Sequence, residues 1–475
     1  MASQGQFMRF ASPNEQRTIS REDLGFYHAV IVGAVYELGD AVDVQSPNSF
    51  FYPLQRCVEE HPYLSVTVCD THADKSFYQR VPNINLEEHI TIADSPTVGD
   101  NLTGIEEVIA SNLDKPFHRD IPLWRVVVLP LQGRCFIAFA FSHAIGDGLI
   151  GPAFHRTFLN ACRSPSEPPR SATALIKTPI RPLPAPFDTP ERLPISWKFL
   201  LAPLFVLILP SFIAKVLGVR ASASPADATT WTASAAAFDL KTHHTKLVVR
   251  EIEAPLLEKA LRVVRIHDAT LTGLFHQIIA RALSKAIPSP NFTNFVSITA
   301  INMRRSIGVS NDEMGDFVSG CYLVHPRTDP SPQFTGENWA AASSASHRLS
   351  ETASTLQDQA IGLLRYLPSI RKWMLGKLGK KRDSSYEVSN IGSFDAQGVS
   401  STDGEVQAKI TKIVFAQPGH VDSSPLAFNL ASTKGDSLMY TVTWPAGALG
   451  FEEADEKQFV DGICSSIRKD LEALE

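Results

Sequence analysis

The stretch "WRVVVLPLQGRCFIAFAFSHAIGDG", residues 124–148, decides the fold class. Two runs of apolar, β-branched and aromatic residues flank the short connection "LQG" at 131–133, which predicts two antiparallel strands joined by a hairpin turn. Neither run alternates between apolar and polar residues, and such continuity is typical of strands that are covered on both faces. The second run is therefore expected to be a central strand, with His143 at its tip.

The length and composition of the chain indicate a globular protein with more than one domain. At 475 residues, 44% of them apolar and 20% charged, the chain exceeds the size of one compact core. Helix and strand patterns predict an α/β (α+β) fold in which each domain is a mixed sheet with flanking helices. We expect an N-terminal domain over 1–180, a Pro-, Ala- and Ser-rich crossover over 181–240, and a C-terminal domain over 241–475.

Patterns in the C-terminal part predict individual elements. Apolar residues recur at helical spacing after Thr270, a residue suited to cap a helix N-terminus. Strands are expected at 294–305, 387–394 and 408–417, and a final helix is expected from Glu453.

The sequence lacks the features that usually mark several classes of function. A net charge of -6 gives no general affinity for nucleic acid. The chain has no GxGxxG, P-loop, HExxH or GxSxG pattern, so we expect no bound metal and no tightly held cofactor. The six cysteines form no CxxC pair, and the N-terminal residues have no apolar signal-peptide core. These features favour a reducing, cytoplasmic location.

The segment at 195–218 is unusually apolar. Residues 199–214 carry no charge, but Pro203 and Pro210 interrupt them. A helix of this length would span about 24 Å, short of a hydrocarbon core of roughly 30 Å. Two interpretations stay open: a buried segment of the core, or a segment that docks on the surface of an intracellular membrane.

The residues that follow the central strand carry the candidate chemistry. Gly146 and Gly148 allow the chain to leave the strand in a tight turn. A neutral imidazole at His143 could take a proton from an alcohol, and Asp147 could brace the turn by pairing with a cation. A purely structural histidine and the first ligands of a metal site are the alternatives.

The "HAIGDG" segment matches the HxxxDG motif of the CoA-dependent acyltransferase superfamily, which includes chloramphenicol acetyltransferase, plant BAHD acyltransferases and peptide-synthetase condensation domains. The segments "PFHRDIPLWRVVVL", "HPYLSV", "INMRR" and "SNIGSF" resemble further signatures of that superfamily. The chain is most similar to the fungal alcohol O-acetyltransferase branch, over roughly residues 15–470. It lacks the DFGWG element of the plant branch, so mechanistic details of that branch are not carried over.

The resemblance implies two chloramphenicol-acetyltransferase-like domains with the active site at their interface. His143 would be the general base. Asp147 would pair with an arginine of the second domain, for which Arg304 matches best and Arg305 is the alternative. Gly148 would leave room for backbone or for the pantetheine arm of CoA.

The resemblance also implies groups that contact the two negative charges of the reaction, the oxyanion of the intermediate and the phosphates of CoA. Candidate donors to the oxyanion are Asn390, Ser389 and Gln417. The basic run at 371–383 could meet the CoA phosphates, although a solvated helix face is the alternative.

The implied function is an O-acetyltransferase that moves an acetyl or short acyl group from acetyl-CoA, its co-substrate, to a hydroxyl of a small apolar molecule. A fungal secondary metabolite or an alcohol would be the acceptor, and the enzyme would act as a monomer by direct His-assisted attack. The alternatives are a non-catalytic binding protein on the same fold and a condensation-type acyltransferase that uses a carrier-protein-bound donor.

Overall fold

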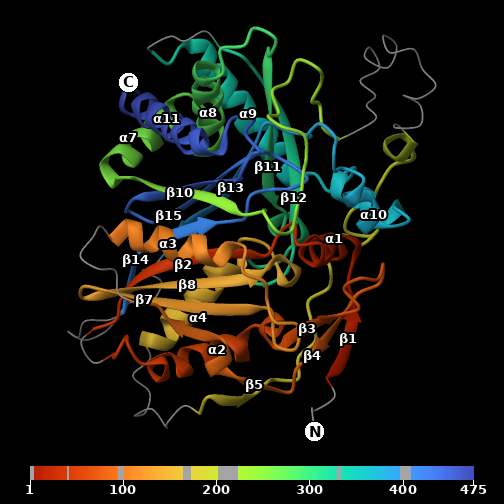
Figure 1. The fold of residues 1–475 in the computed structure, drawn as a ribbon, viewed down its shortest axis with the longest axis vertical. Helices are drawn as coiled ribbons and strands as arrows, with labels where there is room; N and C mark the ends of the chain where they lie inside the picture. The colour runs from red at the N-terminus through yellow and green to blue at the C-terminus, as the bar shows by residue number, and fades with distance from the viewer. Residues whose placement is uncertain are drawn as a thin grey trace.

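The computed structural model describes residues 5–39, 42–94, 101–163, 173–201, 223–328, 333–395 and 408–474. The described chain forms two α/β halves, one above the other in Figure 1, with the N-terminal elements mainly in the lower half and the C-terminal elements mainly in the upper half. Each half contains one large mixed sheet flanked by helices, as the sequence predicts.

The lower half is built on a five-stranded sheet of order β14-β2-β8-β7-β6. Its strands are β2 (Ala29–Glu37), β6 (Ile90–Ile92), β7 (Trp124–Leu131), β8 (Arg134–Ser142) and β14 (Lys409–Ala416). The hairpin of β7 and β8 and the central position of β8 confirm the prediction from the opening stretch. Its helices are α2 (Phe51–Glu60), α3 (Asn101–Leu113) and α4 (Ile150–Arg163).

The upper half is built on a six-stranded sheet of order β10-β16-β15-β13-β11-β12. Its strands are β10 (Thr245–Ile252), β11 (Asn294–Asn302), β12 (Val318–Pro326), β13 (Tyr386–Phe394), β15 (Leu426–Thr433) and β16 (Leu438–Pro445). Its helices are α7 (Ala254–Ile266), α8 (Leu271–Ala286), α9 (Gly336–Ser354) and α11 (Glu453–Glu472). Thr270 caps α8 by accepting from the Gly273 backbone, and α11 begins at Glu453, as expected.

Strand β14 connects the two halves. It follows β13 of the upper sheet in the chain, yet it pairs antiparallel with β2 of the lower sheet, from Lys409 opposite Glu37 to Ala416 opposite Ile31. The sequence pattern predicts this strand but not its partner, because periodicity reports which faces are buried and not which strand lies alongside. The lower sheet therefore includes a strand from beyond residue 241.

Smaller elements close the edges of the molecule. They are α1 (Pro13–Asp23), α10 (Ile370–Leu375), a three-stranded sheet of β1 (Gln6–Phe10), β4 (Phe77–Arg80) and β3 (Val66–Cys69), and the pair β5 (Asn83–Asn85) and β9 (Leu175–Lys177). Helix α1 is fixed by a capping box between Ser12 and Glu15. Figure 1 shows α1 beside α10, at the level where the two halves meet.

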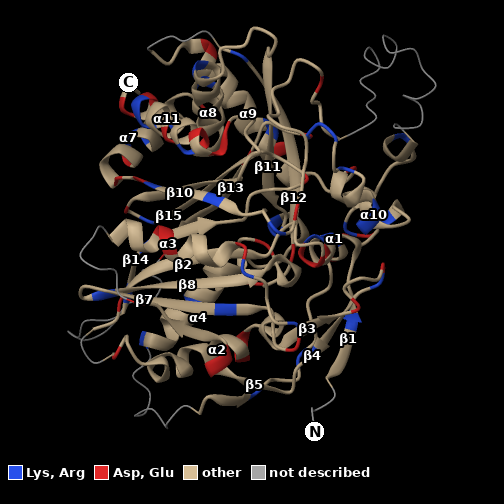
Figure 2. Cartoon of the chain, in the orientation of Figure 1, with Lys and Arg blue, Asp and Glu red and all other residues tan. Residues whose placement is uncertain are grey.

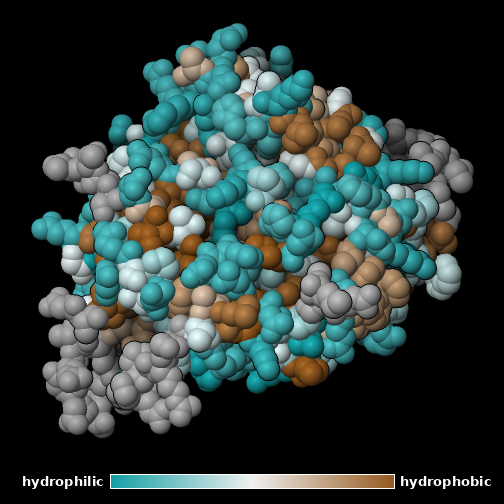
Figure 3. Space-filling view, turned by 60° about the horizontal axis from the view of Figure 1, so that its bottom comes forward, coloured by the Kyte–Doolittle hydropathy of each residue, from teal (hydrophilic) through white to brown (hydrophobic). Residues whose placement is uncertain are grey.

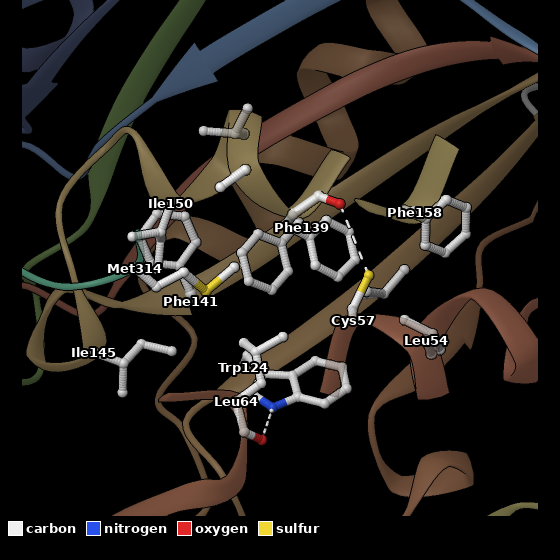
Figure 4. Packing of buried hydrophobic residues seen from close by; sticks show 14 of the residues in the cluster. Leu54, Cys57, Leu64, Trp124, Phe139, Phe141, Ile145, Ile150, Phe158 and Met314 are labelled. Atoms are coloured by element: carbon white, nitrogen blue, oxygen red, sulfur yellow. Dashed lines mark hydrogen bonds between the residues drawn. The ribbon is translucent and has the colours of Figure 1, made fainter. Parts of the chain in front are cut away.

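A continuous apolar core lies beneath β8. Phe139 and Phe141 of β8 stack at 5.0 Å, and the Trp124 indole donates to the Leu64 carbonyl at 2.9 Å. Met314, from the segment after β11, belongs to the same core, and Figure 4 shows it beside Phe141. The upper half thus inserts a side chain into the core that supports the end of β8.

Most of the apolar segment at 195–218 falls outside the described residues, which stop at 201 and resume at 223. At its described start, Trp197 is exposed and the Ser196 side chain donates to Asp358. Among the described residues, no helix is both long and apolar enough to cross a membrane. On the face shown in Figure 3, apolar residues form small patches separated by hydrophilic ones.

Candidate active site

The site begins where β8 ends, in a short 3₁₀ turn over His143–Ile145. The Ser142 hydroxyl accepts from the Ala144 backbone at 3.0 Å and donates to the Glu22 carboxyl of α1. Gly146 has φ 155°, and a Cβ there would lie 2.6 Å from Cγ2 of Ile150. Only glycine fits at this position, so the turn directs the chain from β8 into α4.

Asp147 forms a buried ion pair with Arg304, which follows β11. The Asp147 Oδ2 accepts from Nη1 of Arg304 at 2.8 Å and from the Phe317 backbone at 2.9 Å, while Oδ1 accepts from the Leu149 backbone at 3.0 Å. Arg304 has no exposed surface, whereas Arg305 is exposed. Of the two arginines that the sequence leaves open, Arg304 is therefore the one that pairs with Asp147.

The same arginine holds the segment at 313–317. Its guanidinium donates to the carbonyls of Glu313 and Gly315, at 3.1 Å and 3.0 Å, and lies 4.7 Å from the centre of the Phe317 ring. The Asp147 backbone also donates to the Gly315 carbonyl, at 3.2 Å. The motif after β8 and the segment after β11 are thus bound together at several points across the two halves.

His143 lies at this junction with 15% of its side chain exposed. Its Nδ1 is enclosed and lies 3.8 Å from Oδ2 of Asp316, and its ring centre lies 5.8 Å from that of Tyr27. Burial, together with the positive charges of Arg17 and Arg21 on α1, lowers the pKa of His143 to about 3. The imidazole is therefore neutral, the form in which it can accept a proton.

A network of polar side chains surrounds the His143 ring. The Tyr27 hydroxyl donates to Oε1 of Gln417 at 2.9 Å, and the Arg21 guanidinium lies 4.4 Å from the centre of the Tyr27 ring. Arg21 also contacts Nδ1 of His420 at 2.9 Å, and His420 lies 3.2 Å from the Glu387 carboxylate. Figure 2 shows charged residues gathered around α1 and α10, where the halves meet. No local sequence pattern marks this network, because its members come from three distant stretches of the chain, 21–27, 387 and 417–420.

The three predicted oxyanion donors differ in where their side chains lie. The Asn390 amide donates to Thr272 of α8 at 3.1 Å, and the Gln417 amide donates to Glu387 and Asn429 at 2.9 and 2.7 Å. Successive side chains of a strand point to opposite faces. Ser389 therefore shares its face of β13 with Glu387, which accepts from Gln417, and lies on the face opposite to Asn390.

Two other predicted site regions contact the rest of the protein closely. A Cβ at Gly148 would lie 2.9 Å from Ile391 and 3.2 Å from Phe415, so the absence of a side chain at Gly148 lets the upper half and β14 approach the motif. In the basic run at 371–383, Arg371 pairs with Asp23, and buried Arg382 donates to the carbonyls of residues 420, 421 and 423. These contacts favour a structural role for the two arginines.

Two cavities adjoin the motif and its partner segment. One, of about 370 Å³, is lined by Ala144 next to His143, by Glu22, and by apolar side chains that include Phe117, Phe238 and Leu240. The other, of about 660 Å³, is more polar and is lined by α2, α4 and residues 310–314.

Two joined α/β halves with an HxxxDG turn at their junction define the chloramphenicol-acetyltransferase-like class of fold, which condensation domains share. Within that class, the chain belongs to the alcohol acetyltransferase family, whose sequence model matches residues 98–464. Membership of this family supports an acyltransferase activity.

Individual proteins are similar to the chain over most of its length. The chain is 24% identical to an uncharacterised protein of Schizosaccharomyces pombe, over 92% of this chain and 91% of that protein. It is 23% identical to the probable alcohol acetyltransferase FCK4 of Fusarium pseudograminearum, over 87% and 82% of the two chains. The solved structure of the TRI3 trichothecene 15-O-acetyltransferase of Fusarium sporotrichioides has the same fold, with a TM-score of 0.68, 15% identity, and coverage of 99% of this chain and 94% of that one.

Proposed function

We propose that the protein is an O-acetyltransferase that moves an acetyl or short acyl group from acetyl-CoA to a hydroxyl of a small apolar molecule, such as a fungal secondary metabolite or an alcohol. The observation that carries this proposal is the neutral His143 at the junction of the halves, beside the buried pair of Asp147 and Arg304. That pair holds the turn from which the imidazole projects, so the base keeps a fixed position.

In the proposed reaction, Nε2 of His143 takes the proton of the acceptor hydroxyl as its oxygen attacks the thioester carbonyl. The carbon–sulfur bond then breaks, and the imidazolium returns the proton to the departing CoA sulfur, so no acyl-enzyme forms. Proton transfer of this kind contributes about 10²–10⁴-fold to a rate, and the alignment of two bound substrates contributes at least as much.

The tetrahedral intermediate requires a hydrogen-bond donor for its oxygen. Of the three candidates, we propose the Ser389 hydroxyl, because the Asn390 and Gln417 amides donate within the protein. The Ser389→Ala variant tests this role. We expect kcat to fall about tenfold or more with little change in KM, and an unchanged kcat would contradict it.

The cavity beside Ala144 supports an acceptor that is mostly apolar and carries a hydroxyl. Its wall combines the aromatic rings of Phe117 and Phe238 with the carboxyl group of Glu22. Replacing Phe238 by Ala is expected to shift kcat/KM toward bulkier alcohols by roughly 10-fold, as pocket volume does in other enzymes. An unchanged order of preference would place the acceptor elsewhere.

The experiment that tests the function measures CoA release from several acyl-CoAs against a panel of alcohols, with the ester identified by mass spectrometry. Turnover with some alcohols and not others is the expected result. Turnover only with acyl groups on a phosphopantetheine carrier would support the condensation-type alternative. Saturable binding of an alcohol without any transfer would support the binding-protein alternative.

We further propose that the enzyme acts as a cytoplasmic monomer, with the segment at 195–218 either in the core or docked on a membrane surface. Fractionation without detergent, followed by sedimentation, tests both points. Recovery in the membrane pellet that is lost when 199–214 is deleted from an otherwise folded chain would support docking. The chain has a mass of 52.1 kDa, and a sedimentation mass of twice this value or more would contradict the monomer.

A further inference from the structure

Asp316 is a buried carboxyl group that the reaction described above does not use. Its side chain is nearly inaccessible, and neither of its oxygens has a hydrogen-bond partner among the described residues. Its Oδ2 lies 3.8 Å from Nδ1 of His143, which is likewise buried and has no hydrogen-bond partner from another described residue. A buried polar group left unpaired is costly, so two such groups facing each other call for a functional reason.

The chain on both sides of Asp316 is bound to the motif. The Gly315 carbonyl accepts from the Asp147 backbone, and the Phe317 backbone donates to the Asp147 carboxylate. Arg304 donates to the Gly315 carbonyl as well. The contacts that fix the turn after β8 therefore also fix the position of the Asp316 side chain beside the imidazole.

We propose that Asp316 is the positioning residue for His143, an inference that rests on the proposed acyl transfer. The separation of 3.8 Å is about 1 Å longer than a hydrogen bond, and catalytic hydrogen bonds often tighten only when substrate binds. Once closed, Nδ1–H of His143 donates to the Asp316 carboxylate, which leaves Nε2 as the nitrogen that accepts the hydroxyl proton. The carboxylate then stabilises the imidazolium until its Nε2 proton passes to the CoA sulfur.

The charges around Asp316 determine when it is ionised. The groups that face it are Glu15 and Arg17 of α1, His143 and Asp147 of the motif, Asp188 of the crossover, and the neutral phenols of Tyr27, Tyr63 and Tyr78. Burial raises the pKa of Asp316 to about 8; Arg17 opposes this rise, while the carboxylates of Asp147, Glu15 and Asp188 add to it. Because only the ionised carboxylate carries the negative charge that stabilises the imidazolium, the active fraction of enzyme grows as the pH rises toward 8.

The test is the pH profile of kcat/KM between pH 5.5 and 9.5, for the wild-type enzyme and for Asp316→Asn. In the wild type we expect a rise of about tenfold per pH unit that levels off near pH 8. The amide oxygen of Asp316→Asn still accepts from Nδ1–H but does not titrate. Its profile should therefore be flat, with kcat at pH 9 at least about tenfold below the wild type and KM nearly unchanged.

Asp268→Asn is the matched control, because that aspartate is exposed and pairs with the exposed His347 of α9. It should keep the wild-type profile. Three results would overturn the proposal while leaving acyl transfer intact. The wild-type profile could be flat through pH 8, or it could be centred near the ordinary imidazole pKa of 6.5. Alternatively, Asp316→Asn could show the same rise as the wild type. If Asp316→Asn does not fold, the wild-type profile alone tests the proposal, which requires the rise in kcat/KM that levels off near pH 8. Absence of transfer at every pH would overturn both this proposal and the proposed function.

Discussion

Replacing Arg304 by Met should lower the free energy of unfolding by about 4 kcal/mol. The substitution keeps the volume of the buried side chain but leaves the Asp147 carboxylate without its cation, and removing one partner of a buried pair costs about 3–5 kcal/mol. The Glu313 carbonyl loses its guanidinium donor, and the Gly315 carbonyl keeps only the Asp147 backbone as donor. The segment at 313–317 would then be bound to the motif only through its backbone contacts with Asp147, so acyl transfer should fall together with stability.

Urea denaturation followed by tryptophan fluorescence measures this loss, and Arg305→Met is the matched control. Arg305 is the adjacent residue in the chain and is exposed, so its replacement should change the free energy of unfolding by less than about 0.5 kcal/mol. The reasoning is refuted if Arg304→Met costs less than about 1 kcal/mol, or if the two variants lose equal stability.

Three further predictions concern the turn, its carboxyl neighbour and the thiols. Gly146→Ala should reduce transfer at least about tenfold because its Cβ would meet Ile150, whereas Gly133→Ala, in the open turn between β7 and β8, should keep full activity; equal rates would contradict this. Burial raises the pKa of Glu22 to about 7 in the folded protein, so this carboxyl group ionises at a lower pH in the unfolded chain. The free energy of unfolding should therefore fall as the pH rises from about 5 to 7. In Glu22→Gln, thermal melts over the same pH range should show a weaker fall. The four buried cysteines, Cys57, Cys135, Cys321 and Cys464, should react slowly with an aromatic disulfide reagent until the protein unfolds, since burial restricts access and raises the pKa of the Cys135 thiol to about 12. Fast labelling of more than two thiols in the native protein would contradict this burial.

The elements that are continuous in the chain could be predicted from it. The hairpin of β7 and β8, the central position of β8 and the start of α11 all follow from apolar periodicity and capping residues. The partner of β14 could not be predicted, because an apolar strand carries no mark of the sheet that it joins.

The candidate site divides in the same way. His143 and Asp147 stand out because glycines and a carboxylate end an apolar strand. Asp316 does not stand out, since it is one of several acidic residues in a polar loop and only the fold brings it to 3.8 Å from the imidazole. Tyr27 and Arg21 likewise gain their place near His143 from the packing of α1 against the turn, which no local pattern encodes.

The most direct test of the central claim compares acetyl-CoA turnover by the wild type and by His143→Ala, with an accepted alcohol and with thiol detection of released CoA. If His143 is the general base, the variant should fold normally, bind acetyl-CoA with similar affinity, and lose at least about a hundredfold in kcat. A folded variant that transfers the acyl group at the wild-type rate would show that His143 is not the base.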